Sequence, residues 1–334
     1  MARFRRPSWN GVLRNRQLFR AEVATKKILP LFRERGPRTL FNSLLVSGIA
    51  APSYPHLLTN SPSERQLEVA AVQLSSQSRV AENLAVCAEL CAAAASRGAK
   101  LIVLPENFAF MGPDSERSGH AEVLGDVDAP IQRALASLAR RHSVFVVGGG
   151  MPERSENHEC PFNTSVVFDP SGTLVGRYRK VHLFDVDLAD GTTLRESATT
   201  TPGKEPVSPR IADFGVGLSI CYDLRFPELY RALVRLGAEV LLAPSAFTLH
   251  TGKDHWHVLL RARAIESQCY VVAAAQWGKH PLGRTTYGHA LVADPWGTVI
   301  AECSDGRGFA LGTIDAGRLT SVRTSLPSLE HRKL

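Results

Sequence analysis

Four polar residues each follow a predicted strand or hairpin, and their types suit covalent catalysis: Glu106, Lys180, Glu196 and Cys221. A free thiol is only a few per cent thiolate at neutral pH, so a nucleophilic Cys221 needs a base that takes its proton. Glu106 is a candidate for that base. Lys180 could donate a hydrogen bond to a developing oxyanion and favour the thiolate. Taken singly, each residue also fits an ordinary role as core thiol, helix cap, surface lysine or loop carboxylate.

The segment VGLSICYDLRFPE, residues 216–228, places Cys221 between two regular elements. The apolar run 216–220 predicts a short buried strand. Pro227 suits the first turn of a helix, where its missing N–H is not needed, and the residues after it predict a helix that stops at Gly237. Cys221 is therefore expected at a strand end just before a helix N-terminus, where α/β sheets present reactive groups.

The elements that must position these residues alternate in type along the chain. Before the first hairpin, the patterns predict strands over 67–74, 100–104 and 143–148, and helices over 80–94 and 130–142. Strands over 162–168 and 173–178 flank a DPSG turn and predict a hairpin. Later patterns predict strands over 239–243, 269–275, 286–293, 298–302 and 309–314, with a loop to Gly252 and a helix over 254–266. This order indicates α/β layers, and we predict one domain of two sheets.

The charge of the chain is unevenly distributed. The 334 residues are 44% hydrophobic and 21% charged, which indicates a globular protein with a large core. The formal net charge is +7, but residues 1–60 contain eleven basic residues against two acidic ones and so carry +9. Since +7 less +9 leaves −2 for the remaining residues, a basic globular face for nucleic acid is not indicated.

The Arg-rich, acid-poor segment 1–60 resembles an organelle transit peptide. We expect it to lie outside the fold and to direct the protein to the mitochondrion, with a further population in the cytoplasm. The alternative is a disordered basic tail that carries no address.

The cysteine positions indicate thiols rather than a disulfide framework. The six cysteines, at 87, 91, 160, 221, 269 and 303, form no CxxC pair, so free thiols in a reducing compartment fit best. Cys87 and Cys91 lie one helical turn apart and are expected in the core, because zinc would require two further ligands nearby. Structural rather than catalytic roles are expected for His182, His250, His255 and His257. No stretch is long and apolar enough to span a bilayer.

Three motifs occur together in the order typical of one family. They are LPENF at 104–108, RYRKVHLFDVD at 177–187 and SICYDLRFPELYRAL at 219–233. They resemble the signatures that carry the Glu–Lys–Cys triad of the nitrilase, or carbon–nitrogen hydrolase, superfamily. We assign residues 67–320 to such a domain and residues 321–334 to a short C-terminal tail. Residues 244–276 and 287–303 resemble the animal Nit branch of that superfamily.

The resemblance implies an α/β fold, a four-layer α-β-β-α sandwich (the nitrilase fold), paired through one helical layer into an αββα-αββα homodimer. It also implies roles for four residues. Cys221 would be the nucleophile and Glu106 the proton acceptor. Lys180 would be the proton donor and hold the oxyanion, and Glu196 would support them.

Three further residues are expected to bind substrate. The resemblance implies that the backbone N–H of Tyr222 shares the oxyanion with the lysine. Arg225 could pair with a substrate carboxylate, and the alternative for it is an internal ion pair with Asp223 or Glu228. Thr251 is expected to assist binding.

The implied reaction is hydrolysis of a linear amide with no metal or cofactor. Within the Nit branch, the implied substrate is deaminated glutathione, which is cleaved to 2-oxoglutarate and cysteinylglycine as a step of metabolite repair. The alternatives are ω-amidase activity on 2-oxoglutaramate or 2-oxosuccinamate, nitrile hydrolysis, and a non-catalytic interaction protein or growth-suppressing signalling protein that retains the fold. The expected partners are a small amide with an acidic acyl part and a second copy of the chain, not nucleic acid or membrane.

Overall fold

The computed structural model describes residues 64–187 and 193–333. The predicted leader, residues 1–60, lies outside the described residues. The localisation predicted from that segment therefore stays a prediction. Of the helices in the described ranges, none combines the length and the apolar character needed to cross a membrane.

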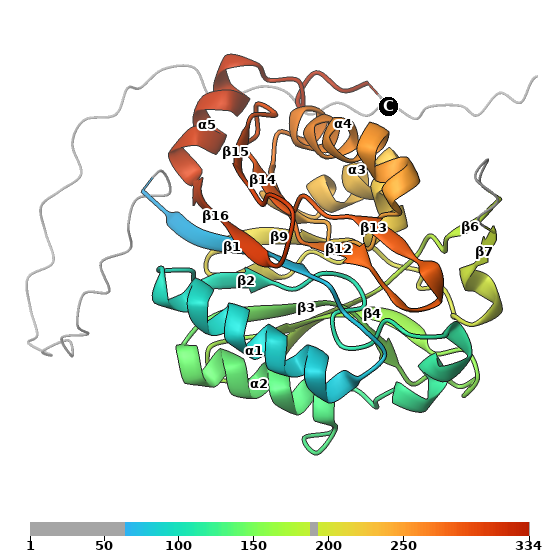
Figure 1. Cartoon of the computed structure of the whole chain (residues 1–334). Coiled ribbons are helices and arrows are strands. Elements are labelled where there is room, and N and C mark those ends of the chain that lie inside the picture. The colour runs from blue at the N-terminus through green and yellow to red at the C-terminus, as the bar shows by residue number, and fades with distance from the viewer. Residues whose placement is uncertain (1–63, 188–192, 334) are drawn as a thin grey trace, which may run out of the picture. The chain divides into compact units, whose positions relative to one another are not determined.

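The first sheet mixes parallel and antiparallel strands in the order β13-β12-β1-β2-β3-β4-β5, with β16 antiparallel beside β1 (Figure 1). Its strands are β1 Gln66–Leu74, β2 Leu101–Val103, β3 Phe145–Glu153, β4 Phe162–Phe168, β5 Leu174–Arg179, β12 Ala275–Lys279, β13 Thr285–Tyr287 and β16 Gly308–Asp315. Helical connections make β1, β2 and β3 parallel, whereas short connections make β3, β4 and β5 antiparallel. β5 therefore runs in the same direction as β2 and β3, so the carboxyl ends of these three strands and the start of β4 lie at one edge of the sheet.

The second sheet has the order β15-β14-β11-β10-β9-β8. Its strands are β8 Arg210–Ile211, β9 Phe214–Leu218, β10 Val240–Leu242, β11 Tyr270–Ala273, β14 Leu291–Ala293 and β15 Val299–Glu302. The three central strands, β9, β10 and β11, run parallel. A separate two-stranded hairpin consists of β6 Asp185–Asp187 and β7 Thr193–Arg195.

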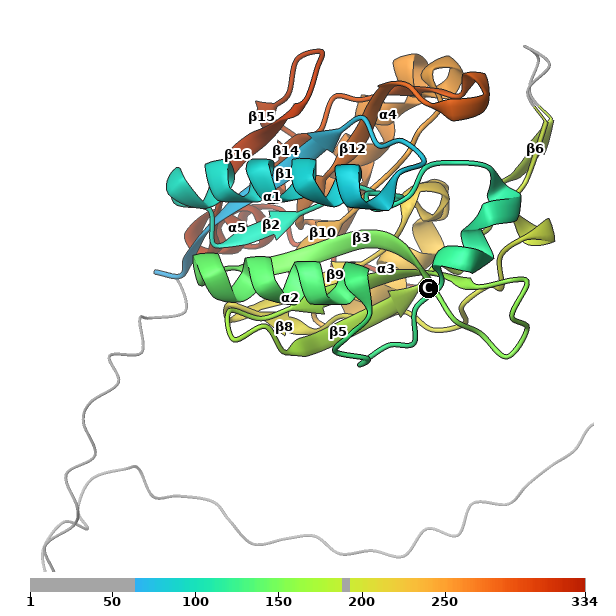
Figure 2. The same cartoon turned by 60° about the horizontal axis from the view of Figure 1, so that its bottom comes forward.

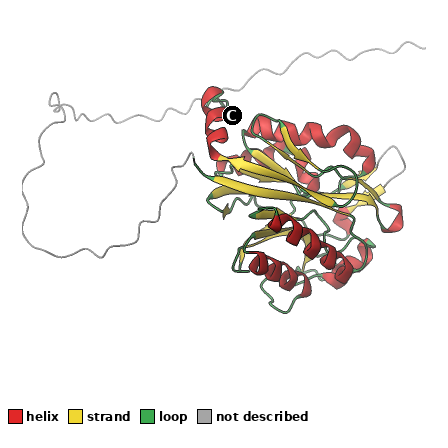
Figure 3. Ribbon diagram, turned by 60° about the vertical axis from the view of Figure 1, so that its left-hand side comes forward, coloured by secondary structure: helices red, strands yellow, loops and turns green. Residues whose placement is uncertain are grey.

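Helices cover the outer faces of both sheets. α1 Val80–Ser96 and α2 Pro130–His142 lie side by side over the first sheet, as Figure 2 shows. α3 Pro227–Arg235 and α4 Leu249–Ser267 cover the second sheet, and the layers are visible edge-on in Figure 3. α5 Ala316–Ser325 follows β16, and short 3₁₀ helices are η1 Asp114–His120, η2 Glu196–Ala198, η3 Cys221–Arg225 and η4 Pro281–Gly283. The predicted α-β-β-α sandwich is confirmed.

Alternation along β1 explains why the two sheets stack. Val69 and Ala71 belong to the core shared with strands of the second sheet, whereas Ala70 and Val72 face the core under α1 and α2. Successive side chains of a strand point to opposite faces, so a strand that is apolar at every position is buried on both sides. β1 is such a strand, and it lies between a helical layer and a second sheet.

Two predicted strands are wrong in the same way. The sequence predicts one strand over 269–275, whereas the chain leaves the second sheet after β11 and enters the first as β12. Likewise, 286–293 divides into β13 in the first sheet and β14 in the second. Residues 269–275 are continuously apolar, and an apolar run indicates burial without indicating which strand its backbone pairs with. In 286–293 the break falls at Gly288 and His289, whose φ values of +79° and +59° are not those of a strand.

Helix boundaries differ from the predictions at α4 and α5. The sequence predicts a loop up to Gly252, but α4 begins at Leu249 and is capped by Thr248, whose hydroxyl accepts a hydrogen bond from the Thr251 N–H. A glycine is required in this first turn, because a Cβ on Gly252 would lie 2.3 Å from Cβ of Tyr287. No pattern predicts α5, which is capped by Asp315, and the predicted start of the C-terminal tail at residue 321 falls inside that helix.

Candidate active site

Cys221 stands at a sharp turn between β9 and α3. Its backbone φ is +50°, a left-handed conformation that is rare for a residue with a side chain. The turn is held from the neighbouring strand, since the Cys221 N–H donates to the carbonyl of Pro244 at 3.0 Å. Cys221 is 7% exposed, so the thiol is nearly buried at the carboxyl end of the parallel strands.

Asp223 ties this turn to the segment after β5. Its carboxylate accepts hydrogen bonds from the Ile220 N–H at 2.9 Å, from the Tyr178 hydroxyl at 2.7 Å and from the His182 N–H at 3.0 Å. The His182 ring contacts the same carboxylate at 2.7 Å through Nδ1 and stacks on Phe226. His182 thus has the structural role expected of it, and it is coupled to the turn that presents Cys221.

Lys180 bridges the two glutamates. Its Nζ donates to Glu106 Oε1 at 2.9 Å and to Glu196 Oε2 at 2.8 Å. Lys180 follows β5, Glu106 follows β2 and Glu196 opens η2 directly after β7, so three distant segments meet here. An ammonium group has three N–H donors, and these two bonds leave one for a substrate oxygen.

Asn163, at the start of β4, lies between the same two glutamates, and the sequence analysis missed it. Its Nδ2 donates to Glu106 Oε1 at 2.9 Å and to Glu196 Oε1 at 3.3 Å. The second oxygen of Glu106, Oε2, accepts from the Ala246 N–H at 3.1 Å. Both oxygens of Glu106 therefore have donors, and the carboxylate is fixed in one orientation.

Asn163→Ala is expected to lower kcat by about 10-fold to 100-fold, because an unsatisfied buried group costs roughly 1–3 kcal/mol and about 1.4 kcal/mol of barrier is one factor of ten. Steady-state amide hydrolysis measures the effect. The exposed Asn157→Ala serves as control and should keep the parent rate. An Asn163→Ala rate within twofold of the parent would contradict a role in orienting the glutamates.

Burial and charge decide the protonation of the site. Burial raises the pKa of the Cys221 thiol well above its ordinary range; the Glu106 carboxylate adds to this, and Lys180 opposes it. Burial alone would lower the pKa of Lys180, but the charges of Glu106 and Glu196 raise it above its usual value. Burial would raise the pKa of Glu196, but Lys180 outweighs it and lowers that pKa. Lys180 favours the thiolate, but burial and Glu106 outweigh its effect, and the pKa of the thiol stays raised.

A pocket of about 210 Å³ opens beside the thiol. It is lined by Phe184, Cys221, Tyr222, Arg225, Ala246, Phe247, Thr248 and Thr251. All three residues predicted to bind substrate line this pocket. Thr251 is 8% exposed, and its hydroxyl is 2.9 Å from that of Thr248. The site thus combines a nearly buried nucleophile with a surface recess beside it.

Arg225 is directed to the pocket rather than to a neighbouring carboxylate. Its Nη1 lies 3.2 Å from Nδ1 of His255, and its guanidinium lies 5.2 Å from the centre of the Phe247 ring. Asp223, one partner that the alternative named, is buried and binds other donors. A cation placed in this way beside an aromatic wall is suited to bind a substrate carboxylate.

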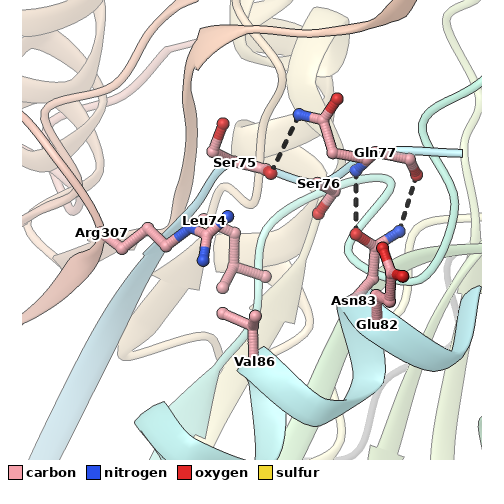
Figure 4. A pocket seen from close by; sticks show the side chains of 8 residues that line it. All are labelled: Leu74, Ser75, Ser76, Gln77, Glu82, Asn83, Val86 and Arg307. Carbon is pink, nitrogen blue, oxygen red and sulfur yellow. Dashed lines mark hydrogen bonds between the residues drawn. The ribbon is translucent and has the colours of Figure 1, made fainter. Parts of the chain in front are cut away.

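A second pocket, of about 320 Å³, lies between the end of β1 and the start of α1 (Figure 4). Among the described residues, it is lined by Leu74, Ser75, Ser76, Gln77, Glu82, Asn83, Val86 and Arg307. None of these eight residues is one of the four catalytic candidates. The Asn83 amide donates to the carbonyls of Gln77 at 2.7 Å and Ala109 at 2.8 Å, and Gln276 donates to the Glu106 carbonyl at 3.0 Å. These bonds fasten the loop that presents Glu106 to α1 and β12. Asn83 and Gln276 therefore have a structural role, which is to hold that loop in place.

Several residues of the site are not predicted from the sequence, and most of them are neutral or apolar. Phe184 and Phe247 line the pocket, and Ala246 contributes only its backbone N–H. Asn163 could have been considered because it is an amide side chain at the start of a predicted strand. Arg117 is buried, its Nη1 donates to Asn107 at 3.0 Å, and its charge helps to lower the pKa of Glu196.

The chain is similar to several known proteins and solved structures. The family model described as carbon–nitrogen hydrolase matches residues 68–324. A protein of Synechocystis sp. named deaminated glutathione amidase is 46% identical over 266 residues, which cover 79% of this chain and 97% of the relative. The human protein of the same name is 42% identical over 311 residues, covering 89% of this chain and 94% of the relative. The crystal structure of Saccharomyces cerevisiae Nit3, described as a member of branch 10 of the nitrilase superfamily, superposes with a TM-score of 0.74 at 31% identity, covering 82% of this chain and 99% of that one.

Proposed function

The chain belongs to the carbon–nitrogen hydrolase family, and from that premise we propose that it is an amidase that hydrolyses deaminated glutathione to 2-oxoglutarate and cysteinylglycine. The substrate assignment rests on one observation. Relatives that are 41–46% identical over most of the chain share the name deaminated glutathione amidase. The pocket beside Cys221 supports it, because Arg225 offers a cation to the carboxylate of the acyl part.

In the first half of the reaction, the Cys221 sulfur attacks the amide carbonyl while Glu106 takes the thiol proton. The oxyanion accepts hydrogen bonds from the remaining N–H of Lys180 and from the backbone N–H of Tyr222. Glu106 then passes the proton to the leaving nitrogen, the C–N bond breaks, and cysteinylglycine departs. A thioester between Cys221 and the 2-oxoglutaryl group remains.

In the second half, water attacks the thioester carbonyl and Glu106 accepts a proton from it. The same donors hold the second oxyanion, the C–S bond breaks, and the proton returns to the sulfur. Glu106 acts as base and then as acid in each half. Because Lys180 and Asn163 hold one oxygen of Glu106 and Ala246 holds the other, the carboxylate keeps one position through both transfers.

Relative turnover of three amides tests the substrate assignment. We expect a higher kcat/KM for deaminated glutathione than for 2-oxoglutaramate or 2-oxosuccinamate. All three have an acidic acyl part, so the comparison isolates the leaving group, which is a dipeptide in the first and ammonia in the others. A preference for either small amide would replace the proposed activity with that of an ω-amidase, and ammonia release from simple nitriles would indicate a nitrilase.

Arg225→Ala is expected to raise KM for the acidic amide by about 10-fold to 100-fold with a smaller change in kcat, since a charge-assisted hydrogen bond contributes roughly 1.5–3 kcal/mol. A neutral amide without the carboxylate should lose much less. Arg235→Ala, at the end of α3, is a matched control. Equal losses on the acidic and the neutral amide would show that Arg225 does not select the acidic acyl group.

We also propose that two copies pair through the α3–α4 layer. Four of the large apolar side chains on or beside these helices are exposed by 46–66%: Leu236, Leu249, Val258 and Ile265. Burial of such a face against a second copy removes it from water. Sedimentation equilibrium should give twice the mass of the chain, and a monomer at micromolar concentration would contradict this.

A further inference from the structure

Three potential metal ligands from three different elements converge near the outer edge of the second sheet. His257 lies on α4, His289 lies between β13 and β14, and Glu302 ends β15. Figure 1 shows α4, β14 and β15 close together in its upper part. His257 Nε2 and His289 Nδ1 are each 2.9 Å from Glu302 Oε1. One ligand atom of each residue lies within 4.8 Å of the other two.

We propose that His257, His289 and Glu302 bind a divalent transition-metal ion, for which Zn²⁺ is the best match. Zinc is bound by imidazole nitrogen and carboxylate oxygen at about 2.0–2.2 Å, and two histidines with one glutamate, completed by water, are an established ligand set. Ligand atoms around a tetrahedral ion at that distance lie roughly 3.3 Å apart. The two nitrogen–oxygen separations of 2.9 Å are close to this value, so the ion needs only a small outward movement of the side chains.

The surroundings of His289 support the assignment. The buried Trp256 donates from Nε1 to the His289 carbonyl at 2.8 Å and so fixes a residue whose φ is +59°. The other ring nitrogen of His289, Nε2, lies 3.9 Å from Asp305 Oδ1, which also accepts from Trp277 Nε1 at 3.2 Å. A metal-binding histidine commonly turns its second nitrogen to a carboxylate, which sets the tautomer and the ring orientation.

The local charge and access also suit a cation. Besides Glu302, the Asp305 carboxylate lies 3.9 Å from His289 Nε2, so a second negative group faces the cluster. The three ligand side chains are 27–34% exposed, which lets an ion and its water reach them. Without an ion, Glu302 accepts hydrogen bonds from both imidazoles, and this hydrogen-bonded triad is the competing explanation.

An ion here would fasten α4 to β15 without touching the catalytic residues. Tyr287 packs on the first turn of α4 at Gly252, next to the pocket residue Thr251, and its ring lies 4.5 Å from that of His289. His257, His289 and Glu302 are not among the residues that line the substrate pocket. Binding should therefore stabilise the fold, whatever the enzyme's substrate is.

Zinc binding to the full-length oligomer tests the proposal. The background variant Cys221→Ala removes the active-site thiol as a competing ligand, and dialysis against a chelator removes bound ions. Calorimetric titration with Zn²⁺ should give one ion per chain, and Co²⁺ should give visible bands of a tetrahedral or five-coordinate centre. Zinc should also raise the midpoint of thermal unfolding, since a ligand that binds the folded state stabilises it.

Matched variants decide between an ion site and a hydrogen-bonded triad. His257→Ala and Glu302→Gln should each weaken Zn²⁺ binding by more than about 100-fold, and Asp305→Asn by about 10-fold as an outer-shell change. The exposed His158→Ala should leave the affinity unchanged. Glu302→Gln keeps the size and one hydrogen-bond acceptor, so it guards against loss of the fold. The proposal is overturned if the parent shows no saturable binding of Zn²⁺ or Co²⁺, or if Glu302→Gln and His257→Ala bind as tightly as the parent.

Discussion

Cys221→Ala is expected to lower kcat on deaminated glutathione by about 10⁴-fold or more, since removal of the nucleophile in a covalent hydrolase leaves only binding and oxyanion stabilisation. The thioester with the 2-oxoglutaryl group should form with the parent enzyme and be absent from the variant. Intact-mass spectrometry after rapid mixing with substrate detects this adduct, and it reports the nucleophile and the acyl group together.

The loss in Cys221→Ala should come from chemistry rather than from unfolding. Alanine keeps a Cβ at φ +50°, so the backbone strain is unchanged, and only a nearly buried sulfur is removed. Cys91→Ala is the matched control, because Cys91 is also a buried thiol but lies in α1, away from the pocket. Full hydrolysis by Cys221→Ala, or a thioester on another cysteine, would refute the mechanism.

Lys180→Met is expected to reduce both activity and stability. It leaves Glu106 and Glu196 without the cation that joins them, and breaking a buried ion pair by removing one partner costs about 3–5 kcal/mol. In addition to this loss of stability, removal of an oxyanion donor should lower kcat by about 10²-fold to 10³-fold. Urea unfolding measures the free energy of unfolding, and single-turnover thioester formation measures the chemical step.

A second variant separates the two effects. In Lys180→Met with Glu196→Gln, one of the two uncompensated charges is removed, so we expect part of the stability to return. The rate should stay low, because the oxyanion donor is still missing. Recovery of the rate together with the stability would mean that Lys180 acts only by holding the fold.

Local patterns were sufficient to predict much of the framework. The helix over 130–142 and the strand over 162–168 are as predicted, because each has the period of its element and clear flanking residues. Cys221 does lie at a strand end before a helix, and Glu106 and Lys180 do follow strands. The Zn²⁺ ligands were not predicted as a group, because His257, His289 and Glu302 are far apart in the chain.

The sequence by itself determined which side chains stand at strand ends, since hydrophobic periodicity and turn residues act over a few positions. Only the tertiary structure decided that Lys180 lies between Glu106 and Glu196, that Asn163 joins them, and that one apolar run serves two sheets through β11 and β12. The reason is physical: burial depends on which face of an element is apolar, whereas pairing depends on backbone hydrogen bonds that every residue can form. The raised pKa of the Cys221 thiol likewise depends on the tertiary structure. It follows from burial by the surrounding elements and from the charge of Glu106, which is distant from Cys221 in the sequence.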